Sequence, residues 1–259
     1  MSDVVFEMDG QVAILRLNRP ERLNSVTPKM LDLIAASLRR AVDEGARAVL
    51  VTGEGRAFCA GADLAATTDG SISKDDLGDA LRTHYNPMTE TFASLPIPVV
   101  TAINGAAAGA GVSIALSGDI VVAARSSYLL LAFANIGLVP DAGATWLVAK
   151  GAGRAKALEM ALLGERLTAA DALSAGLVTR VVDDETLFHE AMVFARKLAS
   201  MPTIALGLIR KQVGAALSAT LTDTLETEAV HQRLASDTED FREGIAAFLQ
   251  KRKAEFVGK

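Results

Sequence analysis

The sequence predicts an α/β protein, on the basis of three patterns. Two apolar segments at residues 4–8 and 12–17 flank Asp9-Gly10, a pair typical of tight β-hairpin turns. Strand-like and helix-like segments then alternate up to about residue 200, which favours a sheet covered by helices. Beyond residue 203 the strand signal disappears. We therefore expect a core over residues 1–200 and a helical region over residues 201–259.

The first helix is predicted from its two ends. Thr27 supplies an N-cap and Pro28 a first-turn proline, and Gly45 ends the segment. Apolar residues recur between these ends at helical spacing. A strand is expected next at residues 48–52, followed by a glycine-containing loop at residues 53–63.

The middle of the chain continues the alternation. Residues 65–79 are polar and predict no element with clarity, and a helix and then a strand at residues 98–103 are expected after them. The glycine-rich turn at residues 104–111 opens a short helix at residues 112–116, and a strand follows at residues 119–124.

The C-terminal region predicts three helices, at residues 203–219, 221–235 and 238–253. Amphipathic helices must bury their apolar face against something. Ile245, Phe248 and Leu249 of the last helix face either the core of the same chain or a neighbouring subunit. We favour oligomerisation.

The composition limits the partners and the compartment. The 26 basic and 31 acidic residues of the 259-residue chain leave a net charge of −5, so nucleic acid and anionic membrane surfaces are not expected partners. Cys59 is the single cysteine, which excludes an intrachain disulfide and indicates a packed core residue. The N-terminus has no secretory signal, and the uncharged residues 99–118 contain Asn104 and several glycines, which indicate strand, turn and helix. We expect a cytoplasmic protein.

Asp141 is the single charged residue between residues 126 and 149. A carboxylate in apolar surroundings costs several kcal/mol unless it is paired, protonated or used in function. The Pro-Asp-Ala-Gly string around Asp141 is also good turn chemistry, and an exposed turn would need no further explanation. From this segment alone, both a turn and a functional acid remain open.

Two glycine loops follow predicted strands and offer backbone N–H groups to an oxygen ligand. Neither loop has the Lys-Ser/Thr pair of a phosphate-binding P-loop, and the glycine spacing at residues 105–111 is wrong for a dinucleotide fingerprint. The third possibility is an oxyanion hole, in which two N–H groups from different loops converge on one carbonyl oxygen. The sequence does not establish that the loops meet.

A combination of strings resembles the crotonase superfamily of enoyl-CoA hydratases and isomerases across nearly the whole chain. The strings are NRP at residues 18–20, GRAFCAGADL at 55–64, NGAAAGAG at 104–111, GLVPDAG at 137–143 and ALSAGLV at 172–178. The resemblance implies a spiral of ββα units with a C-terminal helical region that packs on the core and on neighbouring subunits. It also implies homotrimers, often paired into hexamers.

The resemblance implies the following site for a coenzyme A thioester. The backbone amides of Ala62 and Ala110 form the oxyanion hole, and no cofactor is needed because coenzyme A is part of the substrate. No metal site is expected, since His189 and His231 lack ligand spacing. The other residues implied to bind the substrate are Arg22, Ala60, Asp63, Leu64 and Phe133 around the loops, and Lys251 and Lys253 at the nucleotide of a neighbouring subunit.

The acid residues favour isomerisation. The positions that carry the two glutamates of family hydratases hold Ser113 and Phe133, whereas Asp141 stands where isomerase branches place their single acid. The strings HYNP at 84–87, AFANIGLVPD at 132–141, ALLGE at 161–165 and FREGIAAF at 241–248 resemble the 1,2-epoxyphenylacetyl-CoA isomerases of phenylacetate breakdown, some of which also shift enoyl double bonds from position 3 to 2.

Two alternatives remain beside an isomerase. One is an enoyl-CoA hydratase with a non-standard set of acids, and the other is a relative that binds acyl-CoA or RNA without catalysis. Tyr128 and Trp146 are candidates for the acyl pocket or for the core, and His84 is expected to be structural.

Overall fold

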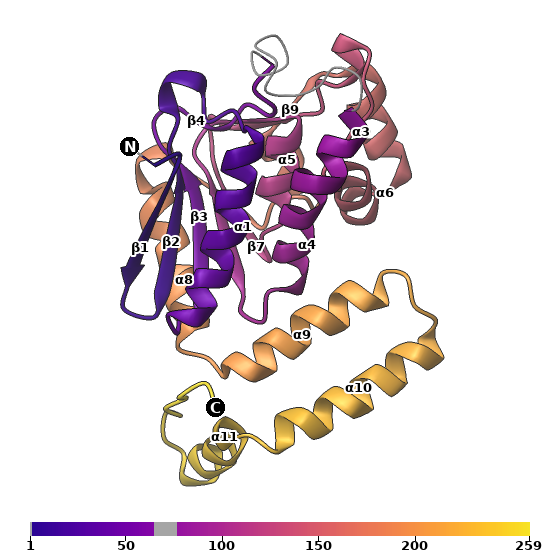
Figure 1. The fold of residues 1–259 in the computed structure, drawn as a ribbon. Coiled ribbons are helices and arrows are strands. Elements are labelled where there is room, and N and C mark those ends of the chain that lie inside the picture. Colours follow the sequence, from indigo (N-terminus) through magenta and orange to yellow (C-terminus); the bar gives the residue numbers. More distant parts are fainter. Residues whose placement is uncertain (1, 65–76) are drawn as a thin grey trace.

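The computed structural model describes residues 2–64 and 77–259, so most of the polar segment at residues 65–79 lies outside the described residues. The larger of its two sheets contains six strands in the order β1-β2-β3-β5-β7-β10 (Figure 1). The strands are β1 (Val4–Asp9), β2 (Val12–Leu17), β3 (Ala48–Gly53), β5 (Val99–Ile103), β7 (Ile120–Ala124) and β10 (Arg180–Val182). β1 and β2 form the antiparallel hairpin predicted from Asp9-Gly10, and all other neighbours are parallel.

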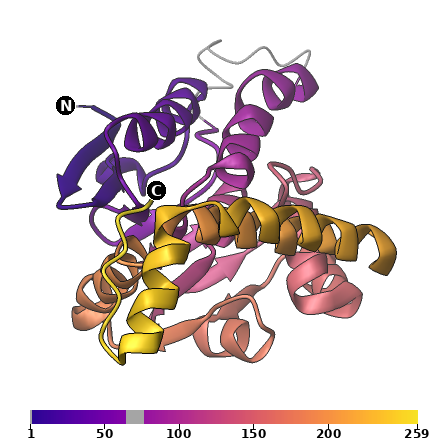
Figure 2. The same ribbon diagram turned by 90° about the horizontal axis from the view of Figure 1, so that it is seen from below.

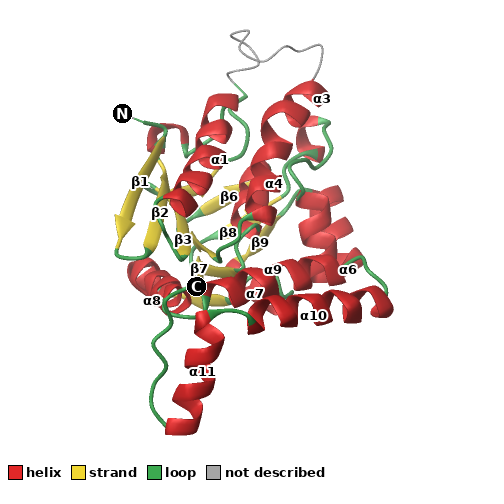
Figure 3. Ribbon diagram, turned by 60° about the horizontal axis from the view of Figure 1, so that its bottom comes forward, coloured by secondary structure: helices red, strands yellow, loops and turns green. Residues whose placement is uncertain are grey.

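A second, smaller sheet lies beside the first (Figure 3). It consists of β4 (Ala57–Cys59), β6 (Ala106–Ala108), β8 (Tyr128–Leu130) and β9 (Arg166–Thr168), in that order. In each of the pairs β3-β4, β5-β6 and β7-β8, the first strand joins the larger sheet and the second joins the smaller one. The chain therefore winds as a spiral in which each strand pair is followed by helix.

Both faces of the larger sheet are buried. Ala13 and Leu15 of β2 pack into one cluster with helix α1 (Pro28–Asp43) and helix α4 (Asn86–Ser94). Val12 and Ile14, which point to the other face, pack into a second cluster with helix α8 (Leu187–Ala199). Successive side chains of a strand alternate between faces, so an unbroken apolar run needs a cover on both sides.

The helix α1 begins as its sequence predicts. The Thr27 hydroxyl accepts the backbone N–H of Met30 at 3.2 Å, and Pro28 occupies the first turn. The remaining helices of the core are α3 (Leu77–Ala80), α5 (Ala110–Leu116), α6 (Ala144–Leu163) and α7 (Ala169–Ser174), and a π-helical segment (Leu81–Tyr85) joins α3 to α4. Short 3-10 helices lie at Pro20–Arg22, Ala134–Ile136 and Asp184–Thr186.

The three predicted C-terminal helices are present as α9 (Thr203–Ala216), α10 (Leu221–Ser236) and α11 (Glu239–Gln250). They lie across one side of the core, and α10 has no buried residue in this single chain (Figure 2). Arg210 of α9 binds the carboxylate of Asp119 at 2.6 Å and the carbonyl of Phe92 at 3.0 Å. These contacts fasten α9 to the core.

Two segments that the sequence predicts as loops contain strands. β4 lies within residues 53–63 and β6 within residues 104–111. Each has three residues of small or mixed side chains, which is too short for a periodic signal, and each becomes a strand through pairing with a distant segment. Among the described residues, no single helix has the length and apolar character of a membrane span, and one helix pair bent by 107° passes that test by composition and length.

Candidate active site

Two asparagine side chains hold the first glycine loop in place by hydrogen bonds to its backbone. The Nδ2 group of Asn24 donates to the carbonyls of Glu54 at 2.9 Å and Ala57 at 2.8 Å. Asn104 donates to the carbonyl of Gly55 at 2.9 Å and accepts from the backbone N–H of Gly53 at 3.2 Å. Asn24 is fully buried, so these bonds replace the water that the loop carbonyls would otherwise bind.

The end of this loop is fixed by an ion pair and a β-bridge. Arg19 and Asp63 are joined at 2.8 Å, and both side chains are more than four-fifths buried. The backbone of Val26 donates to Gly61 and accepts from Asp63. Because N–H groups alternate in direction along an extended segment, the N–H of Ala62 points to the opposite side from Val26. The N–H of the half-buried Ala62 can thus donate a hydrogen bond to the oxygen of a bound ligand.

The second loop ends at the start of helix α5. Gly109 has φ +52° and donates its N–H to the carbonyl of Leu130 at 2.9 Å. Ala110 is the first residue of the helix and is 1% exposed. The first N–H groups of a helix have no partner within the helix, and the dipole of the helix adds positive potential there. The amide of Ala110 therefore meets the requirement for a second donor.

The two loops meet at Gly61 and Gly109. A Cβ atom on Gly61 would lie 2.8 Å from the carbonyl oxygen of Ala108 and 3.4 Å from the Cα of Gly109. Side chains other than hydrogen do not fit at this approach, and Gly61 also has φ +92°. Ala62 and Ala110 each follow one of the touching glycines. The structure therefore brings into contact the two loops that carry Ala62 and Ala110, which the sequence did not establish.

Asp141 lies in a turn that packs against α5 at Ser113, about one helical turn after Ala110. Its main-chain oxygen accepts the N–H of Ala144 at 2.9 Å and the hydroxyl of Ser113 at 3.3 Å. Its Oδ1 atom is buried and has no hydrogen-bond partner among the described residues. The backbone does turn at Asp141, as one interpretation of this segment expected, and the residue is half-buried with its Oδ1 atom in the interior.

Burial raises the pKa of the Asp141 carboxyl from 3.8 to about 6, and the hydrogen bond from its own backbone N–H opposes this rise. Burial also raises the pKa of the Tyr85 hydroxyl, with the charges of Asp141 and Cys59 as further causes. Tyr85 is 4% exposed and ends the π-helical segment, a rare conformation that is frequent at functional sites. An acid with a pKa near neutrality can both accept and release a proton.

The two positions of the hydratase glutamates contain no acid. Ser113 is fully buried, and its hydroxyl donates a hydrogen bond to the main-chain oxygen of Asp141. Phe133 is 7% exposed, and its Cζ atom would lie 3.8 Å from a Cβ built on Gly109. Phe133 therefore lies against the second loop, where it can border a bound acyl chain.

The other residues expected to bind the substrate have different surroundings. Ala60 is half-buried and donates its N–H to Leu23, while Leu64 is 51% exposed beside the oxyanion loop. Arg22 is exposed in the 3-10 helix that precedes this loop. Lys251 and Lys253 are exposed at the end of α11.

The aromatic candidates differ in burial. Trp146 in the first turn of α6 is 46% exposed, so it is not a core residue of this chain. The ring of Tyr128 on β8 stacks on the guanidinium of Arg166 at 4.4 Å. His84 bonds Asp32 of α1 at 2.9 Å, a structural contact between two helices.

Cys59 is fully buried, and burial raises the pKa of its thiol to about 12. It is therefore a packed core residue. Among the described residues, no group of three or more His, Cys, Asp or Glu side chains is arranged to hold a metal ion.

Three supporting residues were not predicted as part of the site. Arg19 lies in the string NRP, Asn24 lies two residues after the candidate Arg22, and Thr89 lies in a helix of ordinary composition. Asn24 has φ +56°, which suits asparagine better than most residues, but a sequence does not report its own dihedrals. Their partners at the site, Asp63, Ala57 and Ala142, lie 44, 33 and 53 residues away, so local patterns carry no signal for these contacts.

Comparisons with known proteins show the family and the fold of the chain. The profile of the enoyl-CoA hydratase/isomerase family matches residues 7–259. The chain is 46% identical to the 1,2-epoxyphenylacetyl-CoA isomerase of Escherichia coli strain K12, over 100% of both chains. It is 41% identical to a probable enoyl-CoA hydratase of Rhodobacter capsulatus, over 98% of this chain and 97% of that protein. The crystal structure of an enoyl-CoA hydratase from Bacillus anthracis matches with a TM-score of 0.93 at 30% identity, over 100% of each chain.

The two-sheet spiral is the crotonase fold, as the sequence resemblance implied. The chain belongs to the enoyl-CoA hydratase/isomerase family and is an enzyme of that family.

Proposed function

We propose that the enzyme is an acyl-CoA isomerase in which Ala62 and Ala110 bind the thioester oxygen and Asp141 transfers a proton. The observation that carries the proposal is the Asp141 carboxyl, whose Oδ1 is buried and has no hydrogen-bond partner among the described residues, in a turn whose main chain bonds Ser113, three residues after Ala110 on α5. The two positions that would supply hydratase carboxylates are Ser113 and Phe133. One acid suffices to move a proton, whereas adding water in the family manner uses two.

The proposed chemistry transfers one proton and shifts one carbon–carbon double bond, with no atom gained or lost. With a 3-enoyl-CoA, the Asp141 carboxylate removes a proton from C2, and the electrons of that C–H bond move onto the thioester oxygen. The N–H groups of Ala62 and Ala110 stabilise this charge. Asp141 then returns the proton to C4: the electrons on the oxygen re-form the carbonyl, the enolate double bond moves to C2 and C3, and the former C3–C4 pair forms the new C–H bond. A carboxyl with a pKa of about 6 suits both steps.

The finer substrate assignment is 1,2-epoxyphenylacetyl-CoA, with 3-enoyl-CoA as an additional substrate. It is supported by the 46% identity, over the full length of both chains, to a protein of that named activity. Arg22 is the proposed contact of the coenzyme A phosphates, and Lys251 and Lys253 would reach the nucleotide of a neighbouring subunit. No separate cofactor or metal is proposed, so activity should survive prolonged dialysis against a chelator.

The test is a panel of acyl-CoA thioesters assayed with the unaltered enzyme and with Asp141→Asn, with product mass and spectrum as readouts. We expect 3-enoyl and epoxyphenylacetyl thioesters to give products of unchanged mass. Asp141→Asn should lower turnover by at least about a hundredfold while thioester binding is retained. Unchanged turnover in Asp141→Asn would dismiss the mechanism.

Hydration is the second candidate, because the Rhodobacter capsulatus relative at 41% identity is named a probable enoyl-CoA hydratase. Crotonyl-CoA distinguishes the two functions, since hydration removes the enoyl absorbance and adds the mass of one water. If no thioester exchanges protons with labelled water, a non-catalytic acyl-CoA-binding role is favoured over both.

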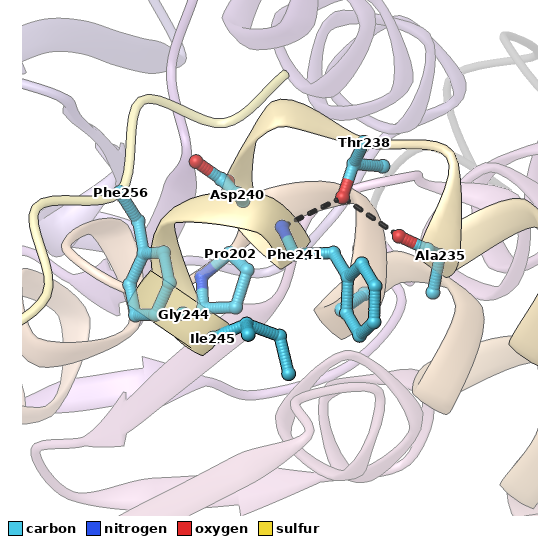
Figure 4. A pocket seen from close by; sticks show the side chains of 9 residues that line it. Pro202, Ala235, Thr238, Asp240, Phe241, Gly244, Ile245 and Phe256 are labelled. Atoms are coloured by element: carbon cyan, nitrogen blue, oxygen red, sulfur yellow. Dashed lines mark hydrogen bonds between the residues drawn. The ribbon is translucent and has the colours of Figure 1, made fainter. Parts of the chain in front are cut away.

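The proposed assembly is a homotrimer or a pair of trimers, formed in part by the C-terminal helices. These helices expose large apolar residues, including Phe248 at 82% and Leu249 at 73%. Between α9, α10 and α11 lies an apolar hollow of about 240 Å³ bordered by Phe241, Ile245 and Phe256 (Figure 4). An apolar face of this kind is expected at a subunit interface.

A further inference from the structure

The turn that carries Asp141 has a strained backbone. Ala142 has φ +49° and Gly143 has φ +85°, and Ala142 is 2% exposed. A non-glycine residue with this conformation is uncommon and persists where its surroundings hold it in place. The direction of the Asp141 side chain therefore depends on contacts that fix the next peptide units.

Two hydroxyl groups from different helices supply such contacts. The Oγ of Ser113 on α5 lies 3.3 Å from the carbonyl oxygen of Asp141. The Oγ1 of Thr89 on α4 donates to the carbonyl oxygen of Ala142 at 3.0 Å. The methyl group of Thr89 also lies 3.2 Å from the position that a Cβ on Gly143 would take. Successive carbonyls of the turn are thus held from two sides.

The contact of Thr89 is distinct from those of its neighbours. The hydroxyls of Thr83, Thr91 and Ser94 donate to carbonyls three or four residues earlier in the same helical segment, and that of Thr91 also accepts from the Arg39 guanidinium, so none of these three hydroxyls bonds the turn. The Thr89 hydroxyl lies 3.1 Å from the carbonyl of Tyr85 and 3.0 Å from that of Ala142, so its single proton is shared between its own helix and the turn fifty-three residues away.

We propose that Ser113 and Thr89 form a hydroxyl clamp that positions Asp141 for proton transfer. They act through the main chain, because the Oδ1 atom of Asp141 has no partner that would orient it directly. The inference rests on the proposed function, in which Asp141 is the acid. A proton-transferring group must lie within hydrogen-bond reach of the reacting carbon, so a shift of the turn lowers the rate more than it lowers binding.

The experiment compares Ser113→Ala, Thr89→Val and the double variant with Thr91→Val. Thr91→Val is a matched control, because it removes a hydroxyl from the same helix without touching the turn. We expect kcat to fall about fivefold in each single variant and further in the double variant, with KM little changed. The acidic limb of the kcat profile should move to lower pH as the carboxylate gains access to water. Thr89→Ser keeps the hydroxyl and should restore both values.

The clamp and the proposed function fail in different ways. If Asp141→Asn is inactive while Ser113→Ala and Thr89→Val retain the kcat and the pH profile of the unaltered enzyme, the clamp is overturned and the isomerase proposal stands. A uniform loss of activity with an unmoved pH profile would also overturn it, since that result indicates a general structural role. Full activity in Asp141→Asn would overturn the proposed function itself. If the double variant does not fold, the single variants decide the matter.

Discussion

Gly61 and Gly109 come from separate loops and lie in direct contact, with the carbonyl of Ala108 only 2.8 Å from the place of a Cβ on Gly61. Each glycine precedes one of the two amides proposed for the thioester oxygen. The approach of the two backbones thus sets the distance between the donors.

Gly61→Ala should therefore damage both the fold and the catalysis. The methyl group meets backbone, which cannot move aside, and alanine is disfavoured at φ +92°, so we expect a loss of about 2–3 kcal/mol of unfolding free energy. Turnover should fall about a hundredfold if one donor is displaced. Gly137→Ala is the control, because Gly137 has φ +73° with open space around it and should lose stability alone. Thermal unfolding and kcat measure the two effects.

The rate should follow the ionisation of Asp141. The base form is required, and burial raises the pKa of this carboxyl to about 6. We expect kcat/KM to rise with pH through a single ionisation with its midpoint at about 6 and then to level off. A midpoint at the ordinary aspartate pKa would mean that another group limits the reaction.

The same carboxyl should lower the stability of the protein above pH 6. A folded-state pKa above the unfolded value means that the folded protein binds the proton more tightly, so its stabilising contribution is present below pH 3.8 and is lost as the pH rises to about 6. Asp141→Asn removes this dependence. The difference in unfolding free energy between the variant and the unaltered enzyme should therefore shift in favour of the variant by up to about 3 kcal/mol between pH 4 and pH 8. Denaturant unfolding of both proteins at the two pH values measures the difference.

The pKa of Asp184 is shifted in the opposite direction to that of Asp141, so Asp184 serves as a control. Hydrogen bonds from Ser126 lower the pKa of its carboxyl, so its contribution is present at neutral pH and is lost as the pH falls. Asp184→Asn should therefore cost stability at pH 8 and not at low pH. Parallel behaviour of the two variants would contradict the assignment for Asp141.

Arg19 and Arg22 should have separable roles. Arg19→Met removes the guanidinium beside the mostly buried Asp63 carboxylate and should cost about 2 kcal/mol of unfolding free energy, with a lower kcat because the Ala62 loop loosens. Arg22→Met should leave stability unchanged and raise KM for the thioester a few-fold if Arg22 binds the coenzyme A phosphates. An unchanged KM would remove Arg22 from the binding site.

The apolar end of α11 should control assembly. Phe248→Glu places a charge on a side chain that is 82% exposed in the single chain, so the folded monomer should tolerate it. If α11 is buried between subunits, the charge has no partner there and the oligomer should dissociate. Light scattering after size-exclusion chromatography gives the mass of each protein. Thr222→Glu on the exposed start of α10 serves as a charge-matched control.

Local patterns in the sequence determined the hairpin, the first helix, the long parallel strands and the three C-terminal helices. These elements follow from spacing, turn residues and caps, which act between neighbours. The candidate residues Asp141, Ala62 and Ala110 could also be predicted from the sequence. A lone charge in an apolar segment and two glycine loops are evident there, and their combination resembles a known family.

The tertiary structure alone decided which of these features meet. The short strands β4 and β6 exist because they pair with distant strands, and the contact of Gly61 with Gly109 depends on that pairing. The bonds of Arg19, Asn24, Ser113 and Thr89 likewise join segments far apart in the chain. A sequence encodes such contacts only through the packing of the whole core, so local reasoning selected the candidate groups and only the fold decided which of their segments lie side by side.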